Sequence, residues 1–300
     1  GAENVSADLR DADACHEAVA GATYVFNLAA DMGGMGFIET HKADCMVSVL
    51  INTHMLVASR EAGVEHFLYG SSACVYAADK QTDPAVTALR ESDAYPAMPE
   101  DGYGWEKLFG ERLCRHFTED FGMETRVARF HNVYGPHGTW EGGREKAPAA
   151  MCRKVLEAID DGSLAVEVWG DGAQTRSFLY VDDCIDGTLA LMASDVGEPL
   201  NIGSEELVTI DGLVDLVSEV AGIEVEKRHR LDRPRGVMGR NSDNTRARTL
   251  LGFEPKVSLR EGIERTFWWI AGERAARQRG AAADRMFTLP APDPRVPVNR

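Results

Sequence analysis

The stretch Tyr24-Val25-Phe26-Asn27-Leu28-Ala29-Ala30 is an apolar run that ends in small residues, which is typical of a buried strand. Similar runs predict three more strands, over residues 5–9, 66–72 and 125–130. Helix-like segments separate the runs, over residues 12–20 and 44–61 and in a long stretch that ends near Gly122. Strands that alternate with helices predict a doubly wound, Rossmann-like α/β fold, with a parallel sheet covered on both faces.

Small and polar residues stand where these strands end. Asp8, the pair Ala29-Ala30, Ser72 and the pair His131-Asn132 all fall at carboxyl ends of expected strands. Ligands of open parallel sheets bind at this edge. We therefore expect the functional site there.

The chain divides into three parts by the texture of its sequence. Residues 1–135 carry the strand–helix alternation. Residues 136–270 begin with a cluster of Gly, Pro and charged residues, and we expect them to form mainly a smaller mixed α/β lobe, with some segments that return to the first domain. Residues 271–300 are rich in Ala, Arg and Pro and are expected to form a flexible tail.

The start of the chain departs from the usual pattern of a dinucleotide-binding domain. Such a domain opens with a strand, a Gly-rich turn and a helix. No GxGxxG or GxxGxxG occurs in this sequence, and the glycines of Gly33-Gly34-Met35-Gly36 have a different spacing. We expect the first strands of the domain to be missing, which would leave a gap inside the sheet.

Composition excludes several classes of partner and site. The formal net charge of −16 argues against nucleic acid or an anionic membrane as the main partner. The six cysteines are scattered, so neither a metal site nor a disulfide framework is indicated, and a reducing cytoplasm fits. No apolar run approaches the ~18 residues of a membrane span.

Tyr103 and Lys107 are the first candidates for chemistry. They stand four residues apart in Tyr103-Gly104-Trp105-Glu106-Lys107, so on a helix they face the same way. An ammonium favours the phenolate, and the pair then predicts a base that takes the proton of an alcohol. Taken alone, this spacing also fits a surface pair.

Three further motifs accompany the pair in order along the chain. They are Ser71-Ser72-Ala73-Cys74-Val75-Tyr76, Arg129-Phe130-His131-Asn132-Val133-Tyr134-Gly135-Pro136 and Arg176-Ser177-Phe178-Leu179-Tyr180-Val181-Asp182-Asp183. With Tyr103 and Lys107 they resemble the extended short-chain dehydrogenase/reductases of the NAD-dependent epimerase/dehydratase family, which act on nucleotide sugars. The run Gly143-Arg144-Glu145-Lys146-Ala147-Pro148 is most similar to members that epimerise a GDP-bound mannose at C3 and C5.

The resemblance implies a mechanism with transient oxidation of the sugar at C4 by NAD. Tyr103 would accept the hydroxyl proton, Lys107 would lower the pKa of Tyr103 and hold the nicotinamide ribose, and Ser72 would hydrogen-bond the reacting oxygen. Cys74 and Lys146 match the acid/base pair that exchanges protons at C3 and C5. Dehydratases of the family are expected to carry an Asp-Glu pair where Ala73-Cys74 stands here, which argues against dehydration.

The resemblance also implies binding roles within the NAD domain, residues 1–135, and the nucleotide-sugar lobe, residues 136–270. It places Asp8 at the adenine and Ala29, Tyr103 and Lys107 at the cofactor. Its substrate-binding positions are Gly33, Ser72, Ala73, Cys74, Asn132, Glu145, Lys146, Ala147, Lys154, Gln174, Arg176, Ser177 and Arg240. The family has a further Arg where this chain has Met238, which weakens the assignment of Arg240 to the phosphates. A homodimer is implied by the resemblance.

Two other hypotheses remain open from the sequence. A 4-epimerase of the same family would keep Tyr103 and Lys107 without needing Cys74 and Lys146. The other hypothesis is a fragment or binding module without turnover. A chain without the Gly-rich turn lacks the backbone N–H groups that cradle a pyrophosphate. We accordingly expect the 300-residue chain to bind NAD weakly or not at all.

Overall fold

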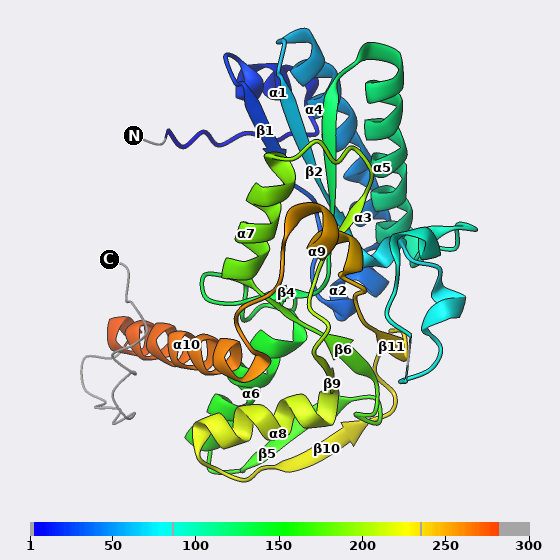
Figure 1. Ribbon diagram of the computed structural model, residues 1–300. Helices are drawn as coiled ribbons and strands as arrows, with labels where there is room; N and C mark the ends of the chain where they lie inside the picture. Colours follow the sequence, from blue (N-terminus) through cyan, green and yellow to red (C-terminus); the bar gives the residue numbers. More distant parts are fainter. Residues whose placement is uncertain (1–2, 86, 235, 282–300) are drawn as a thin grey trace.

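The computed structural model describes residues 3–85, 87–234 and 236–281 (Figure 1). A central sheet of four parallel strands has the order β1 (Tyr24–Asn27), β2 (His66–Ser72), β3 (Glu124–Phe130) and β8 (Leu200–Ile202). Successive side chains of a strand point to opposite faces of the sheet. Phe67 and Tyr69 accordingly pack on one face and Leu68 on the other. The prediction of an α/β fold built on a parallel sheet is confirmed.

Helices cover both faces of this sheet (Figure 1). The face of Phe67 and Tyr69 is covered by α1 (Ala12–Val19), α4 (Val49–Glu61) and α5 (Asp101–Phe121). The face of Leu68 is covered by α7 (Val181–Met192) and α9 (Thr245–Leu251). Two short helices, α2 (Met35–Thr40) and α3 (Lys42–Val47), lie between β1 and α4 in the chain.

A second lobe has its own core below the sheet in Figure 1. Three helices, α6 (Ala147–Asp160), α8 (Ile210–Ala221) and α10 (Leu259–Ala281), pack with the parallel pair β5 (Ala165–Trp169) and β10 (Glu226–Arg230). A three-stranded sheet has the order β11 (Gly239–Arg240), β6 (Thr175–Ser177) and β9 (Leu207–Thr209), and β4 (Val133–Tyr134) pairs with β7 (Leu179–Tyr180).

Short 3₁₀ helices surround the end of β2. They are η1 (Ala73–Val75), η2 (Ala78–Gln81) and η3 (Glu91–Ala94). Among the residues that the structure describes, no helix is both long and apolar enough to cross a membrane.

Several expected elements differ from those observed. Residues 5–9 form no strand, because a strand needs a hydrogen-bonded neighbour and the described partner of β1 is β2 alone. The expected helix over 44–61 is divided at Ser48 into α3 and α4. Helix α10 continues to Ala281, past the expected start of the tail at residue 271, and packs on α6 and α8. Residues 282–300 lie outside the described part of the chain.

Candidate active site

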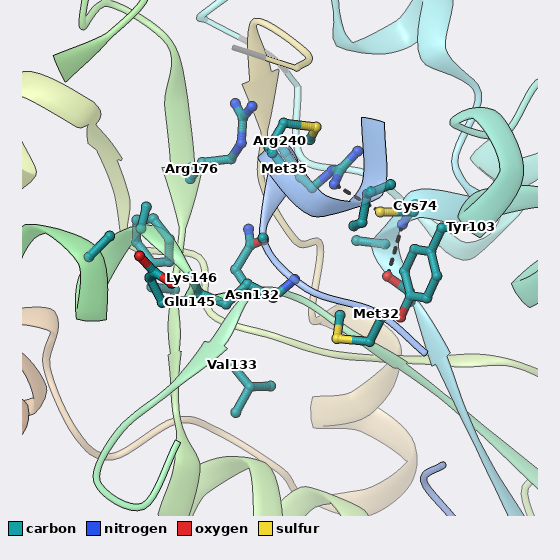
Figure 2. A pocket seen from close by; sticks show the side chains of 18 of the residues that line it. Met32, Met35, Cys74, Tyr103, Asn132, Val133, Glu145, Lys146, Arg176 and Arg240 are labelled. Carbon is teal, nitrogen blue, oxygen red and sulfur yellow. Dashed lines mark hydrogen bonds between the residues drawn. The ribbon is translucent and has the colours of Figure 1, made fainter. Parts of the chain in front are cut away.

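A cavity of about 500 Å³ lies where the carboxyl ends of β1, β2 and β3 face the second lobe. Its lining comes from the strand ends, the start of α5, the residues before and within α6, and the strands β6 and β11. Figure 2 shows Cys74 and Tyr103 on one side of this cavity, with Glu145 and Arg176 across from them. Residues from both parts of the chain therefore meet around one space.

The end of β2 fixes Ser72 and Cys74 relative to each other. The Ser72 hydroxyl oxygen accepts a hydrogen bond from the Cys74 amide at 3.2 Å and so caps the short helix η1. Cys74 is buried, and burial and the charge of Glu100 raise the pKa of its thiol, whereas Arg240 and Lys146 act in the opposite direction. The thiol thus belongs to a network of charges.

Tyr103 stands in the first turn of α5, tightly against the same loop. A methyl group at Gly104 would lie 2.4 Å from the carbonyl oxygen of Cys74, so the helix can approach this closely only with glycine there. Tyr103 is buried, and burial is the main cause that raises the pKa of its phenol. Hydrogen bonding with Ser72 acts to lower that pKa.

Lys107 lies near Tyr103, but its ammonium pairs with a different residue. The Lys107 ammonium lies 5.6 Å from the centre of the Tyr103 ring and forms an ion pair with Glu106 at 3.6 Å. Burial lowers the pKa of Lys107, and Glu106 partly offsets it. Burial is the main cause of the raised pKa of Tyr103, contrary to the expectation that Lys107 lowers it.

Lys146 and Glu145 come from the segment that leads into α6. Lys146 occupies the N-cap position of that helix, and burial and Arg240 lower the pKa of its ammonium. The carboxylate of Glu145 accepts hydrogen bonds from Gly143 N at 2.7 Å and from Arg153 at 3.0 Å. This bracing fixes the turn that presents Lys146 to the cavity.

Arg144 links two segments that each contribute residues to the cavity lining. Its guanidinium pairs with Asp31 at 2.5 Å, and its carbonyl accepts from Gly34 N at 2.9 Å. The guanidinium also stacks over Phe37 at 3.8 Å. The segment after β1 and the segment before α6 are therefore held together.

The wall formed by the second lobe carries more cations and amides. Lys154 donates to the carbonyl of Glu167 at 2.7 Å, and Gln174 donates to the carbonyl of Trp169 at 2.8 Å. Arg176 donates to the carbonyls of Thr175 and Val237. Burial and the charge of Arg240 lower the pKa of Arg176 to about 10.

Asn132 is placed by an unusual backbone conformation. It has a φ of +42°, which asparagine tolerates better than most residues, and its amide donates to the carbonyl of Ser177 at 3.0 Å. The conformation turns the chain sharply after β3. Asn132 therefore faces the cavity between β3 and the second lobe.

Most of the residues expected from the sequence line this cavity, and four do not. Those that line it are Ser72, Ala73, Cys74, Tyr103, Lys107, Asn132, Glu145, Lys146, Ala147, Lys154, Gln174, Arg176 and Arg240. Gly33 is flanked by lining residues Met32 and Gly34, and Ala29 by Leu28 and Ala30. Ser177 is fully buried beside the cavity, whereas Asp8 is exposed and paired with Arg10 at 2.6 Å.

Several residues that shape the site were not predicted from the sequence. Arg153 holds Glu145, and its one signal was the spacing of four residues to Glu157, which is typical of a surface pair. Trp169 lines the cavity at the end of β5. Glu100 pairs with Arg240 across 140 positions of the chain, so no local pattern could indicate it.

Basic side chains outnumber acidic ones in the lining of the cavity, although the protein is acidic. Six basic side chains are among its described lining residues, and Glu145 is the one acidic side chain. The six are Lys107, Lys146, Arg153, Lys154, Arg176 and Arg240. Such a set suits a compact ligand with several negative charges, such as a diphosphate.

Comparison with known proteins agrees with this geometry. Residues 2–203 match the model of the NAD dependent epimerase/dehydratase family. The chain is 50% identical over 264 residues to GDP-mannose 3,5-epimerase 1 of Oryza sativa subsp. japonica, an alignment that covers 88% of this chain and 68% of that protein. The chain thus spans about two thirds of the length of this relative.

Solved structures share the fold at lower identity. UDP-glucose 4-epimerase of Thermotoga maritima, solved with UDP-glucose, has a TM-score of 0.80 and 26% identity, with 89% of this chain and 84% of that chain covered. UDP-glucose 4-epimerase of Thermus thermophilus, solved with NAD, has a TM-score of 0.75 and 25% identity over the same shares. The parallel sheet, the cavity at its carboxyl edge and these relatives agree that the chain belongs to the NAD-dependent epimerase/dehydratase family.

Proposed function

We propose that the chain is an NAD-dependent nucleotide-sugar epimerase that converts GDP-D-mannose to GDP-L-galactose, with GDP-L-gulose as a second product. The observation that carries this proposal is the presence of Cys74 and Lys146 in one cavity with Tyr103. A 4-epimerase needs only the phenol, whereas inversion at C5 and C3 needs groups that remove and supply protons. The similarity to GDP-mannose 3,5-epimerase supports the same substrate.

The residues around Tyr103 fit the nicotinamide end of NAD. Lys107 has three N–H donors and one ion-pair partner at 3.6 Å, so donors remain for ribose hydroxyls. Ala30 and Gly70 keep the space beside it open. Tyr103, Lys107 and Ala29 would hold this end, and Asp8 the adenine. NAD, when bound, supplies reversible hydride acceptance, which makes the hydrogens at C3 and C5 acidic through a transient C4 ketone.

The side chains of the cavity divide the proton transfers among them. Tyr103 takes the proton of the C4 hydroxyl and later returns it, and Ser72 hydrogen-bonds the same oxygen. Cys74 and Lys146 exchange protons with the ring carbons. Burial raises the pKa of the thiol and lowers that of the amine. A thiol and an amine can each act as acid or base, which the exchange of protons at the ring carbons requires.

Cations of the second lobe would hold the nucleotide diphosphate. Lys154 and Arg176 line the same wall, and Gln174 offers amide contacts beside them. Arg binds phosphate through paired N–H donors. The remaining substrate contacts are proposed for Gly33, Ala73, Asn132, Glu145, Ala147, Ser177 and Arg240.

Deuterium exchange tests the proposal. The full-length protein is incubated with saturating NAD and GDP-mannose in deuterated water, so that weak binding of the cofactor does not limit the result, and the sugar is examined by NMR. Deuterium at C5 or C3 is expected, and its absence from both carbons would reject the assignment. Inversion at C4 without deuterium would instead identify a 4-epimerase. C74A, with Tyr103 intact, is expected to abolish the exchange.

We also infer a cytoplasmic homodimer. Helices α3, α4 and α5 pack together and expose large apolar side chains on one part of the surface. These side chains are Met46, Val47, Leu50, Trp105 and Phe109. A second copy of the chain would cover them. The six unpaired cysteines fit a reducing compartment.

A further inference from the structure

Arg240 is engaged by the protein on every nitrogen of its guanidinium. Nε donates to Gln81 Oε1 at 2.7 Å, Nη1 donates to Cys74 Sγ at 3.6 Å, and Nη2 donates to the carboxylate of Glu100. The side chain is 3% exposed and comes from β11, far from Cys74 in the chain. The three acceptors together therefore determine where the guanidinium stands.

Glu100 is tied to Cys74 by a second, independent contact. The Glu100 amide donates to the carbonyl of Cys74 at 2.9 Å, and the carbonyl of Glu100 accepts from Gly104 at the start of α5. The carboxylate, the thiol and the first turn of α5 are thus connected through the main chain. Displacement of Arg240 from Glu100 would leave a carboxylate that is only 13% exposed without its partner.

We propose that Glu100 is a positioning residue, which holds Arg240 against Cys74 and thereby sets the charge balance at the proton-transferring thiol. The inference rests on the proposed function, in which Cys74 exchanges protons with the sugar. It assigns Arg240 to the thiol as its charge partner. Glu100 itself touches neither the substrate nor the cofactor in this scheme.

The two charges act on the thiol in opposite directions. Arg240 stabilises a thiolate and Glu100 opposes it, in keeping with the directions in which they shift the pKa of Cys74. Other charged and titratable groups that act on Cys74 come from α5, the segment before α6, and β6. They are Tyr103, Lys107, Lys146 and Arg176. Among the groups named here, Glu100 is the one that carries a carboxylate.

E100Q isolates the charge from the contact. Glutamine keeps an oxygen that can accept from Arg240 and removes the negative charge, so Arg240 stays in place with its charge no longer offset. The pKa of Cys74 is then expected to fall by about one unit. R240Q removes the positive charge and should move the same pKa upward by a similar amount.

The test is the pH dependence of alkylation by iodoacetamide. Cys74 is the one cysteine among the described lining residues of the cavity, and mass spectrometry of its peptide follows its modification. The thiolate is the reactive form, so the midpoint of the pH–rate profile reports the pKa. E100Q should shift the midpoint to lower pH and R240Q to higher pH. E119Q, an exposed carboxylate at the other end of α5, is the matched control and should leave it unchanged.

Opposite shifts support the inference, because general loosening of the fold would expose the thiol in both variants alike. A midpoint that E100Q leaves unchanged or moves to higher pH would overturn it. Circular dichroism checks that each variant is folded. If E100Q does not fold, R240Q still tests the coupling between the thiol and the guanidinium.

The alkylation profile needs neither NAD nor turnover. Opposite shifts in a protein that leaves GDP-mannose unlabelled would therefore reject the proposed function and keep the charge network. Deuterium exchange with an unmoved midpoint would reject only the role of Glu100.

Discussion

The contact between Gly104 and the carbonyl of Cys74 makes G104A a sharp perturbation of the site. The added methyl carbon would lie 2.4 Å from that oxygen, whereas carbon–oxygen contacts of this kind stay above 3.0 Å. Helix α5 and the loop that follows β2 must then separate by at least about 0.6 Å, the difference between 3.0 Å and 2.4 Å. Tyr103 directly precedes Gly104 on α5 and moves with it, away from Cys74.

The expected magnitude combines two opposing effects. Alanine favours a helix over glycine by about 1 kcal/mol, but overpacking against rigid backbone costs about 3 kcal/mol. The net loss of about 2 kcal/mol corresponds to about 3 °C in Tm for a chain of this size. Misplacement of reacting groups by about 1 Å costs on the order of 100-fold in rate, so we expect a loss approaching that in kcat.

G272A is the matched control for this substitution. Gly272 lies in α10 with no atom within 4 Å of an added methyl group. The G272A variant should be more stable to unfolding by about 1 kcal/mol and keep the activity of the unchanged protein. The assay is the rate of deuterium exchange into GDP-mannose beside a thermal melt. A G104A protein with unchanged rate and Tm would refute the argument that this contact aligns Tyr103 with Cys74.

E111L removes the carboxylate that pairs with the buried Arg129 at 2.7 Å. Leaving that guanidinium without its partner costs about 3–5 kcal/mol, so Tm should fall by about 5–8 °C. The prediction is contradicted if E111L melts no lower than the double variant E111L/R129M. Burial lowers the pKa of His131 from 6.5 to about 3, so the unfolded chain binds the extra proton and stability is lost as pH falls between these values. Urea unfolding of H131Q should show a shallower loss over that window, by up to about 1.4 kcal/mol per pH unit, and equal slopes would exclude the effect. W105E, combined with F109E, should halve the mass found by sedimentation, and a wild-type protein that already sediments as a monomer would end the dimer proposal.

Local patterns were sufficient for the elements and for much of the site. The helix with Tyr103 and Lys107 ends where Gly122 adopts a φ of +68°, and the glycine signal placed that end correctly. Ser72, Cys74 and Asn132 stand at strand ends, and parallel strands bring such ends to one edge whatever the loops do. Periodicity and turn chemistry carry this kind of information.

Pairing and desolvation were beyond those patterns. Residues 5–9 have a strand-like sequence, but strand formation depends on a neighbour that composition does not report. The spacing of Tyr103 and Lys107 predicted a lowered pKa, yet burial dominates both groups and Glu106 takes the ammonium. Glu100 and Arg240 meet only through the tertiary fold.

The contrast between an acidic surface and a basic cavity has a consequence for how ligands arrive. At −16 overall, the protein repels any anion at long range, and that repulsion fades within about 8 Å at physiological ionic strength. The six cations of the cavity are enclosed, so salt screens them less. Added salt should therefore increase the rate at which a compact dianion enters more than it weakens the binding of that dianion. Proteins that attract polyanions from a distance show the reverse behaviour. A long polyanion gains nothing from this arrangement, because its charges must lie on the acidic exterior while the cations sit inside.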